Sequence, residues 1–272
     1  MIEVNNYGSG IFSFDNILDA SDEQIKKLIT NIEANVRPEG YSTDDSGRVL
    51  NSGGYEHHQH GQDIAPFRYV NTVFDGISEE DKNTIEKLEK AIYDSVVIYC
   101  KYFPTAMTSI RWKTRGYLIK YTEGKSMGPH SDSSIPYKND QYTPLNQQPI
   151  CNTLTCTITL NNEFTGGDTG FRPWGVNIPG KTGRVLVYPA NFIGCHEIYP
   201  IKSGVRYAYL SWYCHGDVPM ASPRLPENSS KISNSIMQSS SYIDFAQFAK
   251  DVNVSYQPLV SIGMLSPTPD RG

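Results

Sequence analysis

The sequence lacks the features that would direct a protein to nucleic acid or to a membrane. Its 24 Lys and Arg residues are outnumbered by 29 Asp and Glu, for a formal net charge of -5, and the basic residues are scattered rather than clustered. The chain starts MIEVNNYGSG, without the basic and apolar regions of a signal peptide, and no apolar run approaches the length of a membrane span. We expect a cytoplasmic protein with neither nucleic acid nor membrane as a partner.

Cysteine is scarce as well. Only five cysteines are present, and no two are spaced as CxxC, which favours neither a disulfide framework nor a zinc ribbon. Hydrophobic residues make up 38% of the chain, enough to fill a real core. No internal repeat or second domain is evident, so we expect one domain over residues 1–272.

Hydrophobic periodicity predicts two helices in the first part of the chain. Ser21 can cap a helix that has Gln24 at its third position, and apolar residues then recur at helical spacing. A second, longer helix is predicted to begin at Ser78, with acidic residues in its first turn, and to run toward Pro104. Between the two, residues 37–61 are polar and glycine-rich, which predicts a long loop.

The pattern changes to short β-rich runs separated by Gly, Pro and Asn from about residue 110 to 216. The clearest strand is TLTCTITL, residues 153–160, in which threonines alternate with apolar side chains. Further strands are predicted at residues 117–121, 184–188, 196–201 and 205–213. A short helix is plausible at residues 242–252.

These elements predict a mainly β fold with flanking helices, arranged as a double-stranded β-helix, or jelly roll. The expected organisation is a helical support over about residues 1–105, a jelly-roll core over about 106–216 and a C-terminal extension over 217–272.

Two of the six histidines lie where a metal site would need them. His130 and Asp132 follow a predicted strand as an HxD pair whose side chains can project to one side, and His196 lies on another strand. Two imidazoles and a carboxylate on one face of a metal leave the opposite face open, which is the arrangement of non-haem iron(II) oxygenases. An HxD pair alone is weak, because it is usually a surface pair. Arg206 strengthens the pattern, since it lies ten residues after His196 and begins the strand sequence RYAYLSWY.

Three segments carry a resemblance to a known family. They are YLIKYTEGKSMGPHSD, TCTITLNNEFTGGDTGF and VLVYPANFIGCHEIYPIKSGVRYAYLSWY, in that order along the chain. Together they resemble the prolyl-4-hydroxylase-like branch of the iron(II)/2-oxoglutarate-dependent oxygenases, over roughly residues 117–213. The remainder of the chain matches only loosely.

The resemblance implies a set of roles. His130, Asp132 and His196 look like the iron ligands, and Arg206 looks like the guanidinium that binds the distal carboxylate of 2-oxoglutarate with two parallel hydrogen bonds. Tyr121 and Thr159 stand where the family has side chains that reach this co-substrate, although Thr159 would also simply fit a strand. Implied with them are Fe(II), 2-oxoglutarate and O2, with ascorbate as a candidate reductant.

Residues that could contact the prime substrate are less well defined. Arg172 and Trp174 would suit a carboxylate-bearing or aromatic substrate, but a structural pair is as good an interpretation. Trp212 matches a family tryptophan near the metal, and core packing would explain it equally well. Tyr137 lies in a polar insertion, and His58 belongs to the cluster His57, His58 and His60, for which a solvated or substrate-facing loop is favoured over a second metal site.

The resulting hypothesis is a dioxygenase, an oxidoreductase that hydroxylates an unactivated C–H bond of a small molecule such as an amino acid or a natural-product intermediate, with succinate and CO2 as co-products. The retained carboxylate of Asp132 disfavours halogenation, because halogenating members have a small residue there. Two alternatives stay open: a peptidyl, prolyl-type hydroxylase, and a non-catalytic jelly-roll protein that only binds metal. The sequence leaves the oligomeric state unknown.

Overall fold

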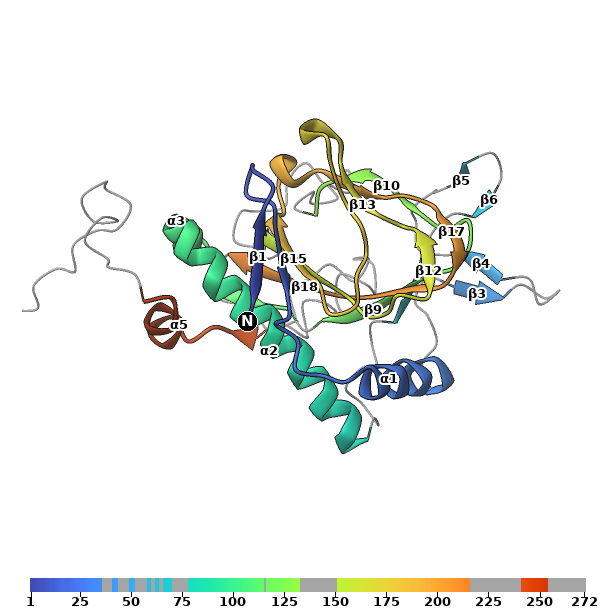
Figure 1. Cartoon of the computed structure of the whole chain (residues 1–272), viewed down its shortest axis with the longest axis horizontal. Coiled ribbons are helices and arrows are strands. Elements are labelled where there is room, and N and C mark those ends of the chain that lie inside the picture. The colour runs from blue at the N-terminus through green and yellow to red at the C-terminus, as the bar shows by residue number, and fades with distance from the viewer. Residues whose placement is uncertain are drawn as a thin grey trace, which may run out of the picture.

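Two antiparallel β-sheets face each other and enclose a barrel, with the helices packed outside it (Figure 1). The computed structural model describes residues 1–35, 41–43, 49–51, 58–59, 62–63, 66–69, 78–114, 116–132, 151–215 and 241–253. Within these residues, no helix combines the length and the apolar run that crossing a membrane requires.

The two predicted N-terminal helices are confirmed, and their first turns show why they begin where they do. Helix α1 spans Asp22–Asn35. The Gln24 backbone N–H donates to Ser21 Oγ at 3.2 Å, and the Ser21 N–H donates to Gln24 Oε1 at 3.1 Å, which is a reciprocal capping box. Helix α2 spans Glu79–Tyr102, and the hydroxyl of its N-cap residue Ser78 accepts the third N–H of the helix.

Two shorter helices follow in sequence. Helix α3 spans Pro104–Thr108, directly after α2. The sequence predicted only that α2 would end near Pro104. Proline is also favoured at the first position of a new helix, because an N–H at that position would have no acceptor within the helix and its loss costs nothing. Helix α5 spans Phe245–Val252, at the expected place in the C-terminal part of the chain.

The larger sheet has the strand order β1-β2-β15-β11-β18-β8-β19, and β9 joins β18 on one side and β7 on the other. Its strands are β1 Glu3–Asn6, β2 Phe12–Asp15, β7 Phe67–Tyr69, β8 Trp112–Lys113, β9 Tyr117–Tyr121, β11 Cys151–Thr159, β15 Val185–Pro189, β18 Arg206–His215 and β19 Ser241–Tyr242.

The smaller sheet has the order β10-β16-β13-β14, and a separate pair, β12-β17, closes one side of the barrel in Figure 1. These strands are β10 Met127–His130, β12 Phe164–Gly166, β13 Thr169–Phe171, β14 Val176–Ile178, β16 His196–Ile198 and β17 Ile201–Gly204. Short 3-10 helices span Arg172–Trp174 (η2) and Phe192–Gly194 (η3).

The alternation predicted for β11 separates two cores. Leu154, Cys156 and Ile158 are buried in the core between the larger sheet and the helices, which also holds Leu88 and Ile92 of α2. Each fully buried aliphatic side chain contributes roughly 1.5–3 kcal/mol to folding. Thr155, Thr157 and Thr159, which alternate with these apolar residues of β11, therefore point the other way, into the barrel.

Two sequence expectations need correction, and two further strands had no counterpart in the predictions. Residues 37–61 were expected to form a long loop, but they contain the short strands β3 Tyr41–Thr43 and β4 Val49–Asn51, which pair, and β5 His58–Gln59, which pairs with β6 Gln62–Asp63. Strands of only two or three residues are too short to show an alternating pattern in the sequence. The N-terminal strands β1 and β2 were also not predicted. The strand expected at residues 196–201 is two strands, β16 and β17, because Pro200 between them has no N–H for a ladder.

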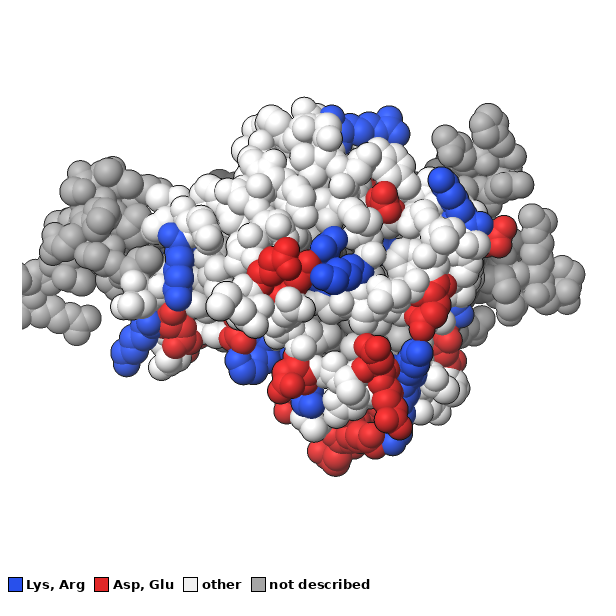
Figure 2. Space-filling model, viewed as in Figure 1, with Lys and Arg blue, Asp and Glu red and all other residues white. Residues whose placement is uncertain are grey.

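Charged side chains of both signs are interspersed on the face shown in Figure 2. Several form ion pairs, such as Lys90 with Asp94 one turn along α2 and Lys26 with Glu163 at 3.0 Å. Exposed pairs of this kind contribute little to stability.

Candidate metal centre

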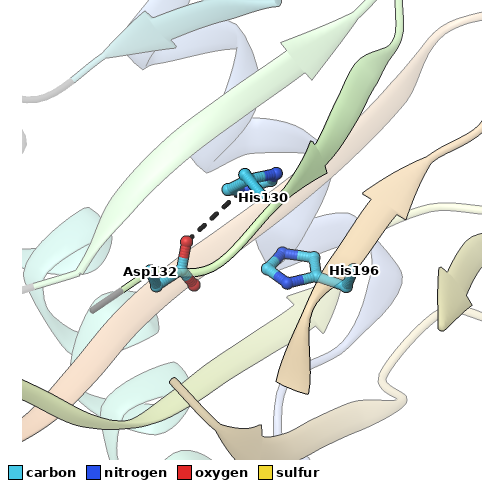
Figure 3. A group of neighbouring side chains, drawn as sticks. All are labelled: His130, Asp132 and His196. Carbon is cyan, nitrogen blue, oxygen red and sulfur yellow. Dashed lines mark ion pairs between the residues drawn. The ribbon is translucent and has the colours of Figure 1, made fainter. Parts of the chain in front are cut away.

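Three side chains that the sequence singled out meet at one point in the barrel. His130 ends β10 and His196 begins β16, and the two residues lie opposite each other in the antiparallel register of these strands. Asp132 follows two residues after His130. The potential ligand atoms of the three side chains all lie within 4.8 Å of one another, and the side chains point toward a common centre (Figure 3).

Backbone carbonyls fix both imidazole rings. Nδ1 of His130 lies 2.8 Å from the Gly128 carbonyl oxygen, and Nδ1 of His196 lies 3.0 Å from that of Gly194. Because a carbonyl oxygen only accepts, each Nδ1 must carry the proton and donate. This tautomer leaves the lone pair of each Nε2 directed at the centre, as metal-ligating histidines require.

The carboxylate of Asp132 is held by one oxygen and open at the other. Its Oδ2 accepts hydrogen bonds from Thr155 Oγ1 at 2.6 Å and from Trp212 Nε1 at 3.2 Å. Its Oδ1 lies 3.3 Å from His130 Nε2 (dashed line in Figure 3). One oxygen is therefore oriented by two donors from the larger sheet, while the other faces the histidines.

The protonation states of Asp132 and His196 suit metal binding. Burial alone would raise the pKa of Asp132, but the neighbouring histidines and the hydrogen bond from Thr155 outweigh it and hold that pKa well below the ordinary range. Burial lowers the pKa of His196 to about 4, so its imidazole is neutral near neutral pH. A charged carboxylate and a neutral imidazole are the ligand forms that a divalent metal needs.

Arg206 begins β18 and is almost completely buried, with 3% of its surface exposed. Its Nε has no hydrogen-bond partner among the described residues. Across the sheet it faces Tyr121, whose ring centre lies 5.4 Å from the guanidinium carbon. An unpaired N–H on a buried cation is costly, so the position calls for an anionic partner.

Gly167 leaves space for the side chain of Arg206. Gly167 has a φ of +68°, and a Cβ at this position would lie 2.4 Å from Ile201 Cδ1 and 3.2 Å from Arg206 Cδ. Any side chain would therefore be strained and would press on the base of the guanidinium. The second glycine of the GG turn in the sequence is therefore required by the close approach of Ile201 and Arg206.

The remaining co-substrate candidates are also in the barrel. Tyr121 is buried at the end of β9. Thr159 is buried on the barrel side of β11, opposite Ala208, which lies two residues along β18 from Arg206. Their contact with a co-substrate stays a prediction.

The substrate-facing candidates fall in different places. Trp212 lies in the barrel and donates to Asp132. Arg172 forms a two-pronged ion pair with Glu197, whose side chain is buried. Trp174 is 45% exposed and donates to the Ile193 carbonyl at 2.7 Å.

Two further candidates are placed only in part or not at all. The backbone of His58 belongs to β5, but its side chain lies outside what the structure describes. Tyr137 lies outside the described residues altogether.

Three residues near the centre were missed by the sequence analysis. Thr155 holds Asp132, Tyr188 contacts His196, and Arg68 of β7 lies opposite Ile119 of β9. Alternation within β11 would have placed Thr155 in the barrel. Tyr188 and Arg68 could not be found without the strand order, because nothing in the sequence says which strands are neighbours.

No protein-family model matches the chain, and no curated protein matches its sequence. Solved structures do match its fold. The viral collagen prolyl hydroxylase of Paramecium Bursaria Chlorella virus-1, in its 2-oxoglutarate complex, matches with a TM-score of 0.51 over 77% of this chain and 98% of that chain, at 14% identity. A Trichoplax adhaerens prolyl hydroxylase, in complex with a hypoxia inducible factor peptide fragment, matches with a TM-score of 0.49 over 76% of this chain and 84% of that chain, at 18% identity.

The first of these matches shows the fold. The chain shares the jelly-roll architecture of the viral prolyl hydroxylase, and the predicted fold class is confirmed.

Proposed function

We propose that this chain is an iron(II)- and 2-oxoglutarate-dependent oxygenase that hydroxylates an unactivated C–H bond. One observation carries the proposal: the barrel holds a His-Asp-His centre and, across from Tyr121 of the same barrel, a buried arginine whose Nε has no hydrogen-bond partner among the described residues. A metal site alone would have no use for that arginine.

The three converging side chains fit Fe(II). His130, Asp132 and His196 would hold the ion, and two imidazoles with one carboxylate on one side leave the other side open. Bound iron supplies the oxidising chemistry, in which substrate C–H, O2 and 2-oxoglutarate become C–OH, succinate and CO2.

The chain's own residues bind and orient the reactants. Arg206 offers a planar fork to the distal carboxylate of 2-oxoglutarate, and the hydroxyls of Tyr121 and Thr159 complete the hydrogen bonds of that carboxylate. The barrel interior is lined by apolar side chains from several strands, which keep water from the reacting atoms: Tyr117, Ile119, Met127, Ile198, Ile201 and Leu210.

A second arginine, Arg68 of β7, is a candidate for binding the prime substrate. Phe67 and Tyr69 of β7 pack toward the helices, so Arg68 between them points to the barrel side, as does its partner Ile119. Burial, the largest single effect, lowers the pKa of His130, but the hydrogen bond and charge of Asp132 outweigh it and the pKa is raised overall. The positive charge of Arg68 acts on the same imidazole and lowers its pKa. Arg68 is only partly buried, unlike Arg206.

This position favours a small substrate that carries a carboxylate, such as an amino acid, over an uncharged peptide segment. Arg172, the residue we had expected to serve such a group, is paired with Glu197. We propose that Arg68, whose positive charge acts on His130 from the barrel side of β7, binds the carboxylate of the prime substrate.

The test measures succinate released by the iron-loaded protein with free amino acids, the corresponding amides and short peptides. We expect turnover with one or more free acids, weaker turnover with the matching amide, and a KM for the acid at least ~10-fold higher in Arg68→Gln, since a charge-assisted bond is worth about 1.5–3 kcal/mol. Arg111→Gln, which alters an arginine beside Phe245 of α5, is the control and should leave KM unchanged.

Other outcomes would decide for the alternatives. Turnover with peptides alone would establish the peptidyl hydroxylase and contradict the small-molecule proposal. Metal binding without any 2-oxoglutarate-dependent O2 uptake, for every candidate tried, would favour the non-catalytic metal-binding protein.

A further inference from the structure

A buried tyrosine occupies the nitrogen of His196 that would bind the metal. The Tyr188 hydroxyl lies 3.1 Å from Nε2 of His196. Because Nδ1 of this imidazole donates to the Gly194 carbonyl, Nε2 carries the lone pair and the tyrosine hydroxyl must be the donor. The hydroxyl and a metal ion therefore compete for one lone pair.

Tyr188 is tightly enclosed by its neighbours. It is 1% exposed. Its ring packs edge-on against Phe171 at 5.0 Å and against His196 at 4.8 Å between ring centres. On β15 it lies directly opposite Thr155 of β11, the residue that holds Asp132.

The surroundings of Tyr188 link the metal centre to the arginine. Burial is the largest cause that raises the pKa of Tyr188, and the charges of Asp132, Tyr121 and Arg206 act on the same hydroxyl. Tyr188 thus lies among the groups that would hold the two ends of a 2-oxoglutarate molecule, the metal at one end and Arg206 at the other.

A metal at Nε2 would leave the Tyr188 hydroxyl without its acceptor in a buried position. A buried donor left unsatisfied keeps the full cost of its lost hydration, which weakens the binding step that displaces it. An oxygen-rich ligand that runs from the metal toward Arg206 passes this hydroxyl and supplies new acceptors. The penalty of metal binding would then be removed by the co-substrate.

We propose that Tyr188 is a positioning residue that makes metal binding and 2-oxoglutarate binding depend on each other, by transferring its hydrogen bond from His196 to the co-substrate. The inference rests on the proposed function, since it needs 2-oxoglutarate as the second ligand. It predicts that the protein binds metal weakly alone and more strongly with the co-substrate, and the same factor applies in reverse to co-substrate affinity.

The test is a calorimetric titration of Mn(II), a stand-in for iron that does not oxidise readily, with and without saturating 2-oxoglutarate. For Tyr188→Phe, which keeps the ring and removes only the hydroxyl, we expect Mn(II) affinity without co-substrate to rise about 5-fold or more. The factor by which 2-oxoglutarate strengthens Mn(II) binding should fall by at least as much.

Tyr213→Phe is the matched control. Tyr213 is fully buried on the helix side of β18, and its hydroxyl has no hydrogen-bond partner among the described residues, so the variant should behave as the wild type. Circular dichroism checks that both variants fold.

The outcomes separate two kinds of failure. An equal, substantial coupling factor in wild type and Tyr188→Phe would overturn the role of Tyr188 and leave the proposed function standing. A wild-type protein that binds Mn(II) but shows no effect of 2-oxoglutarate at all would overturn both.

Discussion

The centre depends on residues that orient its ligands as well as on the ligands themselves. Asp132 receives two hydrogen bonds on the oxygen that does not face the histidines, and the shorter comes from Thr155. Donors of this kind fix the direction of a ligating carboxylate, and their loss typically lowers metal affinity by about 10–100-fold.

Thr155→Val should therefore weaken Mn(II) binding about 10-fold or more, while the fold is kept because valine suits a strand. Calorimetric titration measures the affinity. Thr157→Val is the control, since Thr157 lies on the same face of β11, opposite Leu210, and no contact with the three ligands is expected there. Equal affinities of wild type and Thr155→Val would show that the hydroxyl does not orient Asp132.

At the scale of single residues, the sequence predicted the three converging side chains and the arginine. The HxD pair, the later histidine and the segment RYAYLSWY can all be recognised from their order and spacing along the chain. It did not predict Tyr188 or Arg68. Their roles depend on β15 lying beside β11 and on β7 lying beside β9, and strand order is a property of the folded chain.

At the scale of elements, an ion pair joins the N-terminal strand β2 to β15. Asp15 at the end of β2 is buried, and both its oxygens accept hydrogen bonds from Arg184, at 2.9 and 2.7 Å, with Lys181 at 3.2 Å. The hydrogen bond from Arg184 is the largest cause that lowers the pKa of Asp15 below its ordinary value of 3.8.

Asp15→Asn should destabilise the protein by about 2 kcal/mol, the usual worth of a hydrogen bond to a charged group. Because the folded-state pKa is depressed, this stabilisation is fully present above the unfolded value of 3.8 and is lost as pH falls through the lower folded value. Urea unfolding across a pH series would show the difference between wild type and variant shrinking in acid.

Asp19→Asn, at an exposed aspartate in the segment that follows β2, is the control and should change the free energy of unfolding little at any pH. A difference for Asp15→Asn that stayed constant through the acid range would contradict the assigned ion pair.

Helices and long strands were predictable because caps and periodicity are local, as Ser21 and Ser78 show. The short elements were not. β1, β2 and the pairs β3-β4 and β5-β6 have two to four residues each, too few for a period to be recognised, and they form because a neighbouring strand offers hydrogen-bond partners.

At the scale of the whole molecule, the ligands would tie the two sheets together. The histidines come from the smaller sheet, whereas Arg206, Tyr121 and Tyr188 come from the larger one. A metal and a co-substrate bound between them stabilise the folded state only, so their binding adds to the free energy of unfolding. That residues 1–272 form one domain stays a prediction.

Mn(II) with 2-oxoglutarate, each at about 100 times its dissociation constant, should stabilise the fold by about 2.7 kcal/mol or more. Calorimetric melting should then show Tm higher by roughly 5 °C or more for a chain of this size. Asp132→Ala should lose most of the shift. An unchanged Tm in the wild type would mean that these ligands do not bind between the sheets.

The central claim is that Arg206 binds 2-oxoglutarate beside a metal held by His130, Asp132 and His196. The most direct measurement is a calorimetric titration of 2-oxoglutarate into the Mn(II)-loaded wild type and Arg206→Gln. We predict that the wild type binds the oxoacid and that Arg206→Gln binds it at least ~100-fold more weakly, as the loss of a two-pronged charge-assisted pair implies, while Mn(II) binding by the variant is retained. Undiminished 2-oxoglutarate binding by Arg206→Gln would contradict the account.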